Sequence, residues 1–326
     1  MRKLGIIGGT SWASTALYYD HINRGVAQRL GGLHSARLVI ESLDLAPVAK
    51  MELSGDWDGV AKVTLDAAKR LVTAGAEGVI ITSNTGHKVF DAVAANIPVP
   101  MLHIADATAD RIVADGRTRV ALLGTRFTMT EPHVRSRLES RGISLAPVDP
   151  TWIAEVDRII FEELAAGRVI RDSQRKLKTL IAELARQKVH AVVLGCTELV
   201  LAVDTRANTI PVYDTTSLHA RAAVEWMLTD EEDVVLDIFG GSNTTGFTAE
   251  ALKRKWLTFE MNREYLSSSA FRFLEGHNSE TVKQVLGELN NSHANYFIGA
   301  TVCTLDPAKK AKLKNESLGQ GALFVS

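Results

Sequence analysis

VIITSNT (79–85) and VVLGCTE (192–198) are two versions of one short pattern. In each, an apolar run leads directly into small and polar residues, as a buried strand of a parallel sheet leads into the turn before a helix. The two copies lie 113 residues apart and bring Ser83 into register with Cys196. A strand that recurs in this way predicts that the fold is built twice.

Two further segments repeat in the same order. GIIGGTSWAST (5–15) aligns with VALLGTRFTMT (120–130) at an offset of 115, and NIPV (96–99) aligns with TIPV (209–212) at 113. Each match alone is short enough to arise from common strand–turn patterns. Three matches in one order, at nearly one offset, indicate a duplicated unit.

Amphipathic segments of helical period, such as 58–75 and 172–187, lie between the apolar runs. Strands that alternate with helices form parallel sheets covered by those helices. We therefore expect an α/β fold with two pseudo-symmetric lobes, each a parallel sheet flanked by helices, and an active site between them. The expected division is lobe 1 at 1–113 with 214–229, lobe 2 at 114–213, and a partly disordered, βαβ-like fragment at 230–326.

Composition narrows the class of protein. The 326 residues carry a formal net charge of −1, which gives no global reason to expect nucleic acid or a membrane as a partner. No apolar stretch approaches the roughly 20 residues of a membrane span. The two cysteines, Cys196 and Cys303, stand far apart, and no Cys/His spacing is typical of zinc. We expect a cytoplasmic protein without a disulfide or a metal.

Cys196 and Ser83 each follow a strand, and active sites of open α/β sheets lie at the carboxyl ends of strands. If the two lobes face each other, these side chains approach a ligand from opposite sides, which suits racemisation or epimerisation. A thiolate is a competent base because the reference pKa of a thiol is about 8.5. Polar groups at the strand–helix turns would stabilise the carbanion, and the candidates are Ser11, Asn84, Thr85, Thr125 and Thr197.

The same residues also have a purely structural interpretation. A lone cysteine is often part of the core, and Ser83 with its two successors could serve only as a strand end and a helix cap. The polar neighbours Thr197 and Glu198 favour a functional interpretation of Cys196.

Four motifs together resemble the aspartate/glutamate racemase family over residues 1–228: GIIGGTSWAST (5–15), SNTGH (83–87), FEELAAGR (161–168) and LGCTEL (194–199). The resemblance implies a homodimeric amino-acid racemase, an isomerase that uses neither pyridoxal phosphate nor a metal. By this resemblance Cys196 is the base and acid on one face of the substrate. It also implies that Thr10, Ser11, Asn84, Thr85 and Thr197 surround the α-carboxylate and amino group, and that Arg168 faces a distal carboxylate.

One departure from the family pattern concerns the mechanism. The family opens its first central motif with cysteine, as in CNTAH, or in one branch with threonine, whereas this chain has Ser83. A hydroxyl ionises far less readily than a thiol, so we expect Cys196 to abstract a proton efficiently from one enantiomer and the reverse direction to be slow. A single-thiol decarboxylase of a malonate-like acid remains an alternative. The accepted side chain also stays open, because segment 42–56 contains no arginine and only Lys50 as a cation.

The last hundred residues resemble a different family. VVLDIFGGSNTTGFTAEAL (234–252) and WLTFEMNREY (256–265) are similar to the S-adenosylmethionine-binding end of DNA amino-methyltransferases. The resemblance implies that a working site would use Asp237, Phe239, Gly240, Gly241 and Glu260. The chain has no Pro-Pro, which these enzymes need to hold the target amine, and only two strands are recognisable. We therefore expect a truncated methyltransferase fragment, with a methyltransferase-related protein as a further alternative function.

Overall fold

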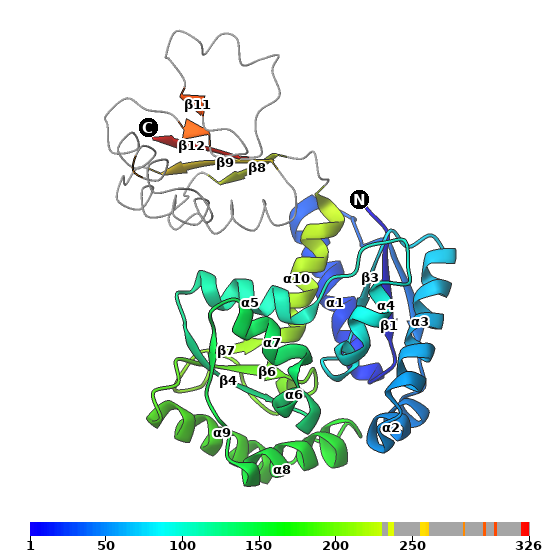
Figure 1. Ribbon diagram of the computed structural model, residues 1–326, viewed down its shortest axis with the longest axis vertical. Coiled ribbons are helices and arrows are strands. Elements are labelled where there is room, and N and C mark those ends of the chain that lie inside the picture. The colour runs from blue at the N-terminus through cyan, green and yellow to red at the C-terminus, as the bar shows by residue number, and fades with distance from the viewer. Residues whose placement is uncertain are drawn as a thin grey trace. The chain divides into compact units, whose positions relative to one another are not determined.

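The computed structural model describes residues 1–229 and, beyond them, residues 234–237, 255–260, 283, 296–297, 303–304 and 321–325 (Figure 1). The chain divides into two compact units, Met1–Leu228 and Thr229–Ser326. The first unit contains both copies of the repeat.

The first sheet of this unit has three parallel strands in the order β2-β1-β3. Their bounds are Leu4–Gly8 for β1, Leu38–Ser42 for β2 and Gly78–Ile81 for β3. The associated helical segments are α1 (Trp12–Leu30), α2 (Leu45–Ser54), α3 (Trp57–Thr73), η1 (Thr85–Val89) and α4 (Phe90–Ala94).

The second sheet has four parallel strands in the order β5-β4-β6-β7. They are β4 (Arg119–Gly124), β5 (Ser144–Leu145), β6 (Ala191–Gly195) and β7 (Val212–Asp214). The helical segments are α5 (Ile104–Ala114), α6 (Arg126–Thr130), α7 (Pro132–Ser140), α8 (Pro150–Arg158), η2 (Ile159–Leu164), α9 (Arg171–Arg186), η3 (Leu199–Leu201) and α10 (Thr215–Leu228).

The two sheets repeat one topology. The order β2-β1-β3 of the first sheet recurs as β5-β4-β6 in the second. In the second sheet, the outer strand β7 pairs with β6 at Val212 and Val192. In the first sheet, its counterpart is reduced to a single β-bridge between Val79 and Met101. The predicted fold of two similarly built parallel sheets flanked by helices is confirmed.

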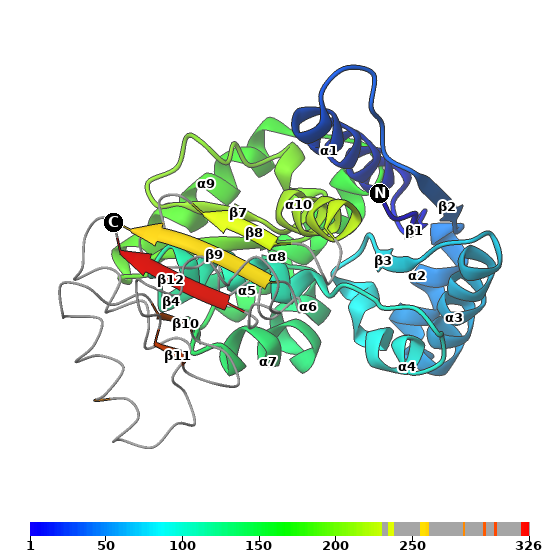
Figure 2. The same ribbon diagram turned by 90° about the horizontal axis from the view of Figure 1, so that it is seen from above.

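Helices cover both faces of each sheet (Figure 2). In the first lobe, α1 and α10 pack on one face through Tyr18, Ile22 and Val224, and α3 and α4 pack on the other through Leu71 and Val93. In the second lobe, α5 and α7 cover one face, while α8, η2 and α9 cover the other. Because both faces are buried, the central strands are almost wholly apolar, as the sequence pattern predicted.

Helix α5 lies on the other side of the predicted lobe boundary. A division at residue 113 assigns α5 to the first lobe, but Ala105, Ala109 and Ile112 pack in the same cluster as Val120 and Leu122 of β4. These three residues of α5 thus pack with the second sheet, and α5 also contacts α10. Amphipathicity shows that a helix has a buried face but does not show which of two sheets it covers.

Glycine at position 9 is required by the turn from β1 into α1. Gly9 has φ of +82°, and a Cβ added there would stand 2.0 Å from the carbonyl oxygen of Leu43. The Gly9 N–H donates to the Thr15 hydroxyl at 2.8 Å, and the Ser11 hydroxyl caps α1 by accepting from the Ser14 N–H at 3.3 Å. This closely packed turn holds Thr10 at the edge of the sheet.

The described residues of the second unit form a sheet of five strands in the order β11-β10-β12-β9-β8. Strands β8 (Val234–Asp237) and β9 (Lys255–Glu260) match the two expected ones and are parallel. The sequence did not indicate the other three, β10 (Tyr296–Phe297), β11 (Cys303–Thr304) and β12 (Gly321–Val325). The helix expected between β8 and β9 lies outside the described residues.

Candidate active site

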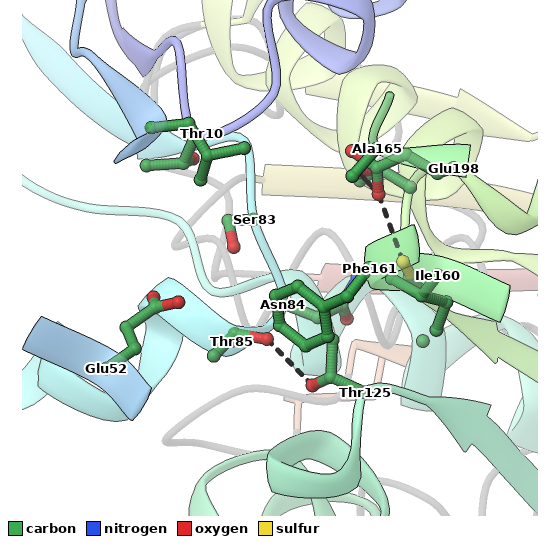
Figure 3. Close-up of a pocket in the computed structure, with 14 residues that line it drawn as sticks. Thr10, Glu52, Ser83, Asn84, Thr85, Thr125, Ile160, Phe161, Ala165 and Glu198 are labelled. Atoms are coloured by element: carbon green, nitrogen blue, oxygen red, sulfur yellow. Dashed lines mark hydrogen bonds between the residues drawn. The ribbon is translucent and has the colours of Figure 1, made fainter. Parts of the chain in front are cut away.

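A pocket lies where strands of both sheets end (Figure 3). Its volume of about 50 Å³ compares with the ~10–15 Å³ needed by one water, so it admits a compact ligand. It is lined by Thr10, Leu45, Glu52, Ser83, Asn84, Thr85, Thr125, Ile160, Phe161, Ala165, Gly195, Cys196, Thr197 and Glu198. Seven of these, namely Thr10, Ser83, Asn84, Thr85, Thr125, Cys196 and Thr197, are residues that the sequence singled out.

Cys196 follows β6 and is 6% exposed. Its thiol donates a hydrogen bond to Glu198 Oε2 at 3.0 Å, and the Thr197 hydroxyl donates to the same oxygen at 2.8 Å (Figure 3). Burial, together with the adjacent Glu198 carboxylate, raises the pKa of the Cys196 thiol well above its ordinary value. The sulfur is therefore protonated at rest, and its proton is held against a carboxylate that can accept it.

Substituting Glu198 with glutamine should lower the pKa of Cys196, because the change removes the nearby negative charge and keeps a side chain of the same shape. The expected result is that thiolate absorbance near 240 nm and alkylation by iodoacetamide both begin at lower pH than in the wild type. Both proteins should carry Cys303→Ser so that only Cys196 reports. An unchanged or higher thiol pKa in the glutamine variant would show that Glu198 does not control this thiol.

Ser83 enters the pocket from the first lobe, after β3. In the view of Figure 3 it lies across the pocket from Glu198, the residue that holds the thiol. The Ser83 hydroxyl oxygen accepts the Gly86 N–H at 3.1 Å, and no described residue accepts the hydroxyl proton. Ser83 is thus arranged as a proton donor toward the pocket.

His87, four residues after Ser83, is a candidate base, but both of its ring nitrogens are engaged by backbone groups. Its Nδ1 lies 2.6 Å from the Ser83 carbonyl oxygen, and its Nε2 accepts the Ile104 N–H at 3.2 Å. Burial lowers the pKa of His87 well below the ordinary value, so the ring is neutral and Nδ1 is the donor. His87 fixes the backbone at Ser83 but leaves no nitrogen to activate its hydroxyl.

Hydrogen bonds beside the pocket link the first sheet to the second. The Thr85 hydroxyl lies 2.9 Å from that of Thr125. Asn84 Nδ2 donates to the Thr215 hydroxyl at 3.0 Å, and Thr215 in turn donates to the Leu194 carbonyl of β6 at 2.8 Å. Among the described residues that line the pocket, two buried oxygens have no hydrogen-bonding partner, Asn84 Oδ1 and Thr10 Oγ1. Since buried polar atoms are normally paired, these two are available to a ligand.

Two residues expected at the site do not line the pocket. Ser11 is buried, but its hydroxyl is engaged in capping α1. Arg168 is exposed, and its guanidinium donates to the Glu162 carbonyl. The structure thus does not bring Arg168 to the pocket, where a distal carboxylate would need it.

The sequence analysis did not identify Glu52 or the wall formed by Ile160, Phe161 and Ala165. Glu52 belongs to α2 and is only 6% exposed. The wall comes from η2, a π-helical turn, and its C-cap residue Ala165. Widened turns of this kind often occur at functional sites, because they displace side chains from the regular helical positions.

Among the described residues, no group of three or more His, Cys, Asp and Glu side chains is placed to hold a metal ion. Nor does any helix in this part of the chain have the length and apolar character needed to cross a membrane.

Duplicated α/β lobes with a thiol and a hydroxyl in one pocket are the architecture of a racemase-type enzyme. The chain belongs to the Asp/Glu/hydantoin racemase family, whose model matches residues 7–223. A Yersinia pestis protein provisionally assigned as an Asp/Glu racemase is 42% identical, with a TM-score of 0.66 over 70% of this chain and 100% of that one. An aspartate racemase homologue from Pyrococcus horikoshii OT3 is 33% identical, with a TM-score of 0.62 and the same two coverages.

A curated relative from Bacillus subtilis is the broad specificity amino-acid racemase RacX. It is 24% identical over 229 residues, which are 69% of this chain and 98% of that enzyme. The family assignment thus covers the first unit, and these relatives span nearly all of their own length in the comparison.

The C-terminal segment matches a different family, as the sequence indicated. A DNA methylase model matches residues 225–271, and the type II methyltransferase M.PvuII of Proteus hauseri is 61% identical over 54 residues. That stretch covers 17% of this chain and 16% of the methyltransferase. The resemblance is therefore to a small part of such an enzyme.

The residues expected to bind S-adenosylmethionine are only partly described. Asp237 and Glu260 end the parallel strands β8 and β9, whereas Phe239, Gly240 and Gly241 lie outside the described residues. The chain also lacks the Pro-Pro that the transfer of a methyl group to an amine would need.

Proposed function

We propose that the first unit is an amino-acid racemase that works without a cofactor, exchanging the proton at Cα between Cys196 and Ser83. The observation that carries this proposal is that both residues line one pocket, each after the corresponding strand of its lobe. A substrate carbon between them would face a sulfur on one side and a hydroxyl on the other.

The first step is activation of the thiol. The Cys196 proton passes along its hydrogen bond to Glu198 Oε2, giving a thiolate and a neutral carboxyl group. The thiolate then takes the proton from Cα, and the electron pair of the broken C–H bond remains on the substrate as a carbanion conjugated with its carboxylate. No atom leaves the substrate except this proton.

The second step returns a proton to the opposite face. Ser83 delivers its hydroxyl proton to the carbanion, and the bond from the Gly86 N–H stabilises the negative charge that develops on the serine oxygen. Solvent then reprotonates Ser83, and Glu198 releases its proton to solvent, because Cys196 already carries the proton taken from Cα. The enzyme ends the cycle unchanged and the configuration at Cα is inverted.

The remaining polar groups position the substrate. Asn84 Oδ1 and Thr10 Oγ1 are unpaired acceptors, which suit the ammonium group. The Thr125 hydroxyl lies between those of Thr85, at 2.9 Å, and Thr128, at 3.2 Å. If Thr128 donates to Thr125 and Thr125 donates to Thr85, the Thr85 hydroxyl proton is left to donate to the α-carboxylate. Thr197 holds the Glu198 carboxylate in place against the thiol.

The proposal is tested by incubating the purified full chain with single enantiomers of the common amino acids and separating the products by chiral chromatography. We expect the opposite enantiomer to accumulate without added pyridoxal phosphate and in the presence of EDTA. Malonate and its 2-substituted derivatives should be assayed in parallel. Carbon dioxide release from malonates with no racemised amino acid would instead establish the single-thiol decarboxylase.

A further inference from the structure

Glu52 is a buried acid without a partner in the described part of the chain. Val48 and Glu52, one turn apart, form the buried face of α2. The Glu52 side chain is 6% exposed and lines the pocket, yet no hydrogen bond or ion pair connects its carboxyl group to any described residue. Buried carboxyl groups are normally paired because removing them from water is costly. An unpaired one that lines a pocket points to a ligand.

The pocket has an unusual balance of charge for a family named after the acidic amino acids aspartate and glutamate. Apart from Cys196, its ionisable lining residues are Glu52 and Glu198, and no lysine, arginine or histidine lines it among the described residues. Both cations suggested by the sequence, Lys50 and Arg168, are exposed. A substrate with a second carboxylate would find two carboxyl groups and no positive partner.

Glu198 and Glu52 are not equivalent. Glu198 is engaged by Cys196 and Thr197, whereas Glu52 lies apart from them on the other side of the pocket in the view of Figure 3. Burial raises the pKa of Glu52 to about 7, so this carboxyl group would gain from a donor that stabilises its charge. With Cα between Ser83 and Cys196, the polar group left for the substrate's side chain is Glu52.

We infer that Glu52 selects amino acids whose side chain ends in a hydrogen-bond donor, such as an amide, a hydroxyl or an ammonium group, and rejects those that end in a carboxylate. The inference rests on the proposed racemase function. Above the pKa of about 7, the ionised Glu52 would pair with a donor, whereas a carboxylate would meet a like charge.

Isosteric substrate pairs isolate this effect. Asparagine differs from aspartate, and glutamine from glutamate, by one terminal group at almost constant shape. At about pH 9, where Glu52 is ionised, we expect the wild type to favour the amide of each pair by at least about tenfold in kcat/KM, because the acid places a like charge against Glu52. Glu52→Gln should bring the ratio close to one, while Glu139→Gln, which removes an exposed carboxylate on α7, should keep the wild-type ratio.

The ratio of kcat/KM for two substrates, measured on one preparation, does not depend on how much of a variant is folded. A wild type that prefers the acids overturns the inference, and so does a Glu52→Gln variant that loses both members of a pair equally. Isothermal titration calorimetry, with asparagine and with aspartate in turn, gives the corresponding ratio of their dissociation constants. If none of the four amino acids is racemised, the titration still decides the role of Glu52, while the absence of turnover counts against the proposed function.

Discussion

Replacing Cys196 with alanine should lower the rate of Cα proton exchange by about 10³-fold or more, from whichever enantiomer the wild type exchanges faster. A positioned proton-transfer group typically contributes about 10²–10⁴-fold. The effect should fall at the upper end, because Glu198 is the other ionisable group on that side of the described pocket and a carboxylate is a weaker base than a thiolate. Exchange can be followed by proton NMR in D₂O as loss of the Cα signal.

Cys196→Ser is the matched control for this variant. A serine at 196 retains nearly the volume of cysteine and a hydroxyl that can donate to Glu198, but it does not form a useful anion. We expect it to be as slow as the alanine variant while its thermal unfolding midpoint stays close to that of the wild type. Exchange within tenfold of the wild type in either variant would show that the sulfur is not the base.

The two enantiomers should differ in the rate at which the wild type washes deuterium into Cα, by a factor of roughly 10². The enantiomer whose Cα proton faces Cys196 exchanges through a thiolate. The other must lose its proton to Ser83, whose oxygen has no base beside it, because both nitrogens of His87 are occupied. Equal exchange rates from the two enantiomers would contradict this asymmetry.

Substitutions at Ser83 test the same difference between the two enantiomers. Ser83→Cys supplies a thiol on the second face and should accelerate the slower exchange, while the faster one changes little. Ser83→Ala removes the proton donor but leaves Cys196 in place, so rapid exchange without inversion should survive for one enantiomer. An alanine variant that loses exchange from both enantiomers would assign Ser83 a structural role.

The fold could be predicted largely because it is repeated. A single strand such as residues 191–195 is ambiguous, but its match to 78–81 specifies two sheets and pairs Ser83 with Cys196. The turn residues Asn84 and Thr85 followed, since residues after parallel strands meet at one edge.

Other parts of the site depend on side-chain direction, which spacing alone does not specify. Thr10 and Ser11 are neighbours, yet only Thr10 lines the pocket, while Ser11 caps α1. Arg168 follows the π-helical turn η2, whose width no sequence period reveals.

The buried position of Glu52 could have been predicted from the sequence. Its spacing of four from Val48 could have placed it on the buried face of a helix. In segment 42–56 the group expected to bind a side-chain carboxylate was a cation, whereas Glu52 is an acid. In the second unit, β10 and β11 have two residues each, too few to show any alternation.

The most direct test of the account is the isotope found in the first product formed. The wild type is incubated with one unlabelled enantiomer in D₂O. The opposite enantiomer is isolated after a few per cent conversion, and its mass is measured by mass spectrometry. We predict one deuterium at Cα in nearly every product molecule, because the proton leaves to one group and a solvent-exchanged group on the other face delivers its replacement. Product that retains its original hydrogen at Cα would contradict proton transfer between Cys196 and Ser83.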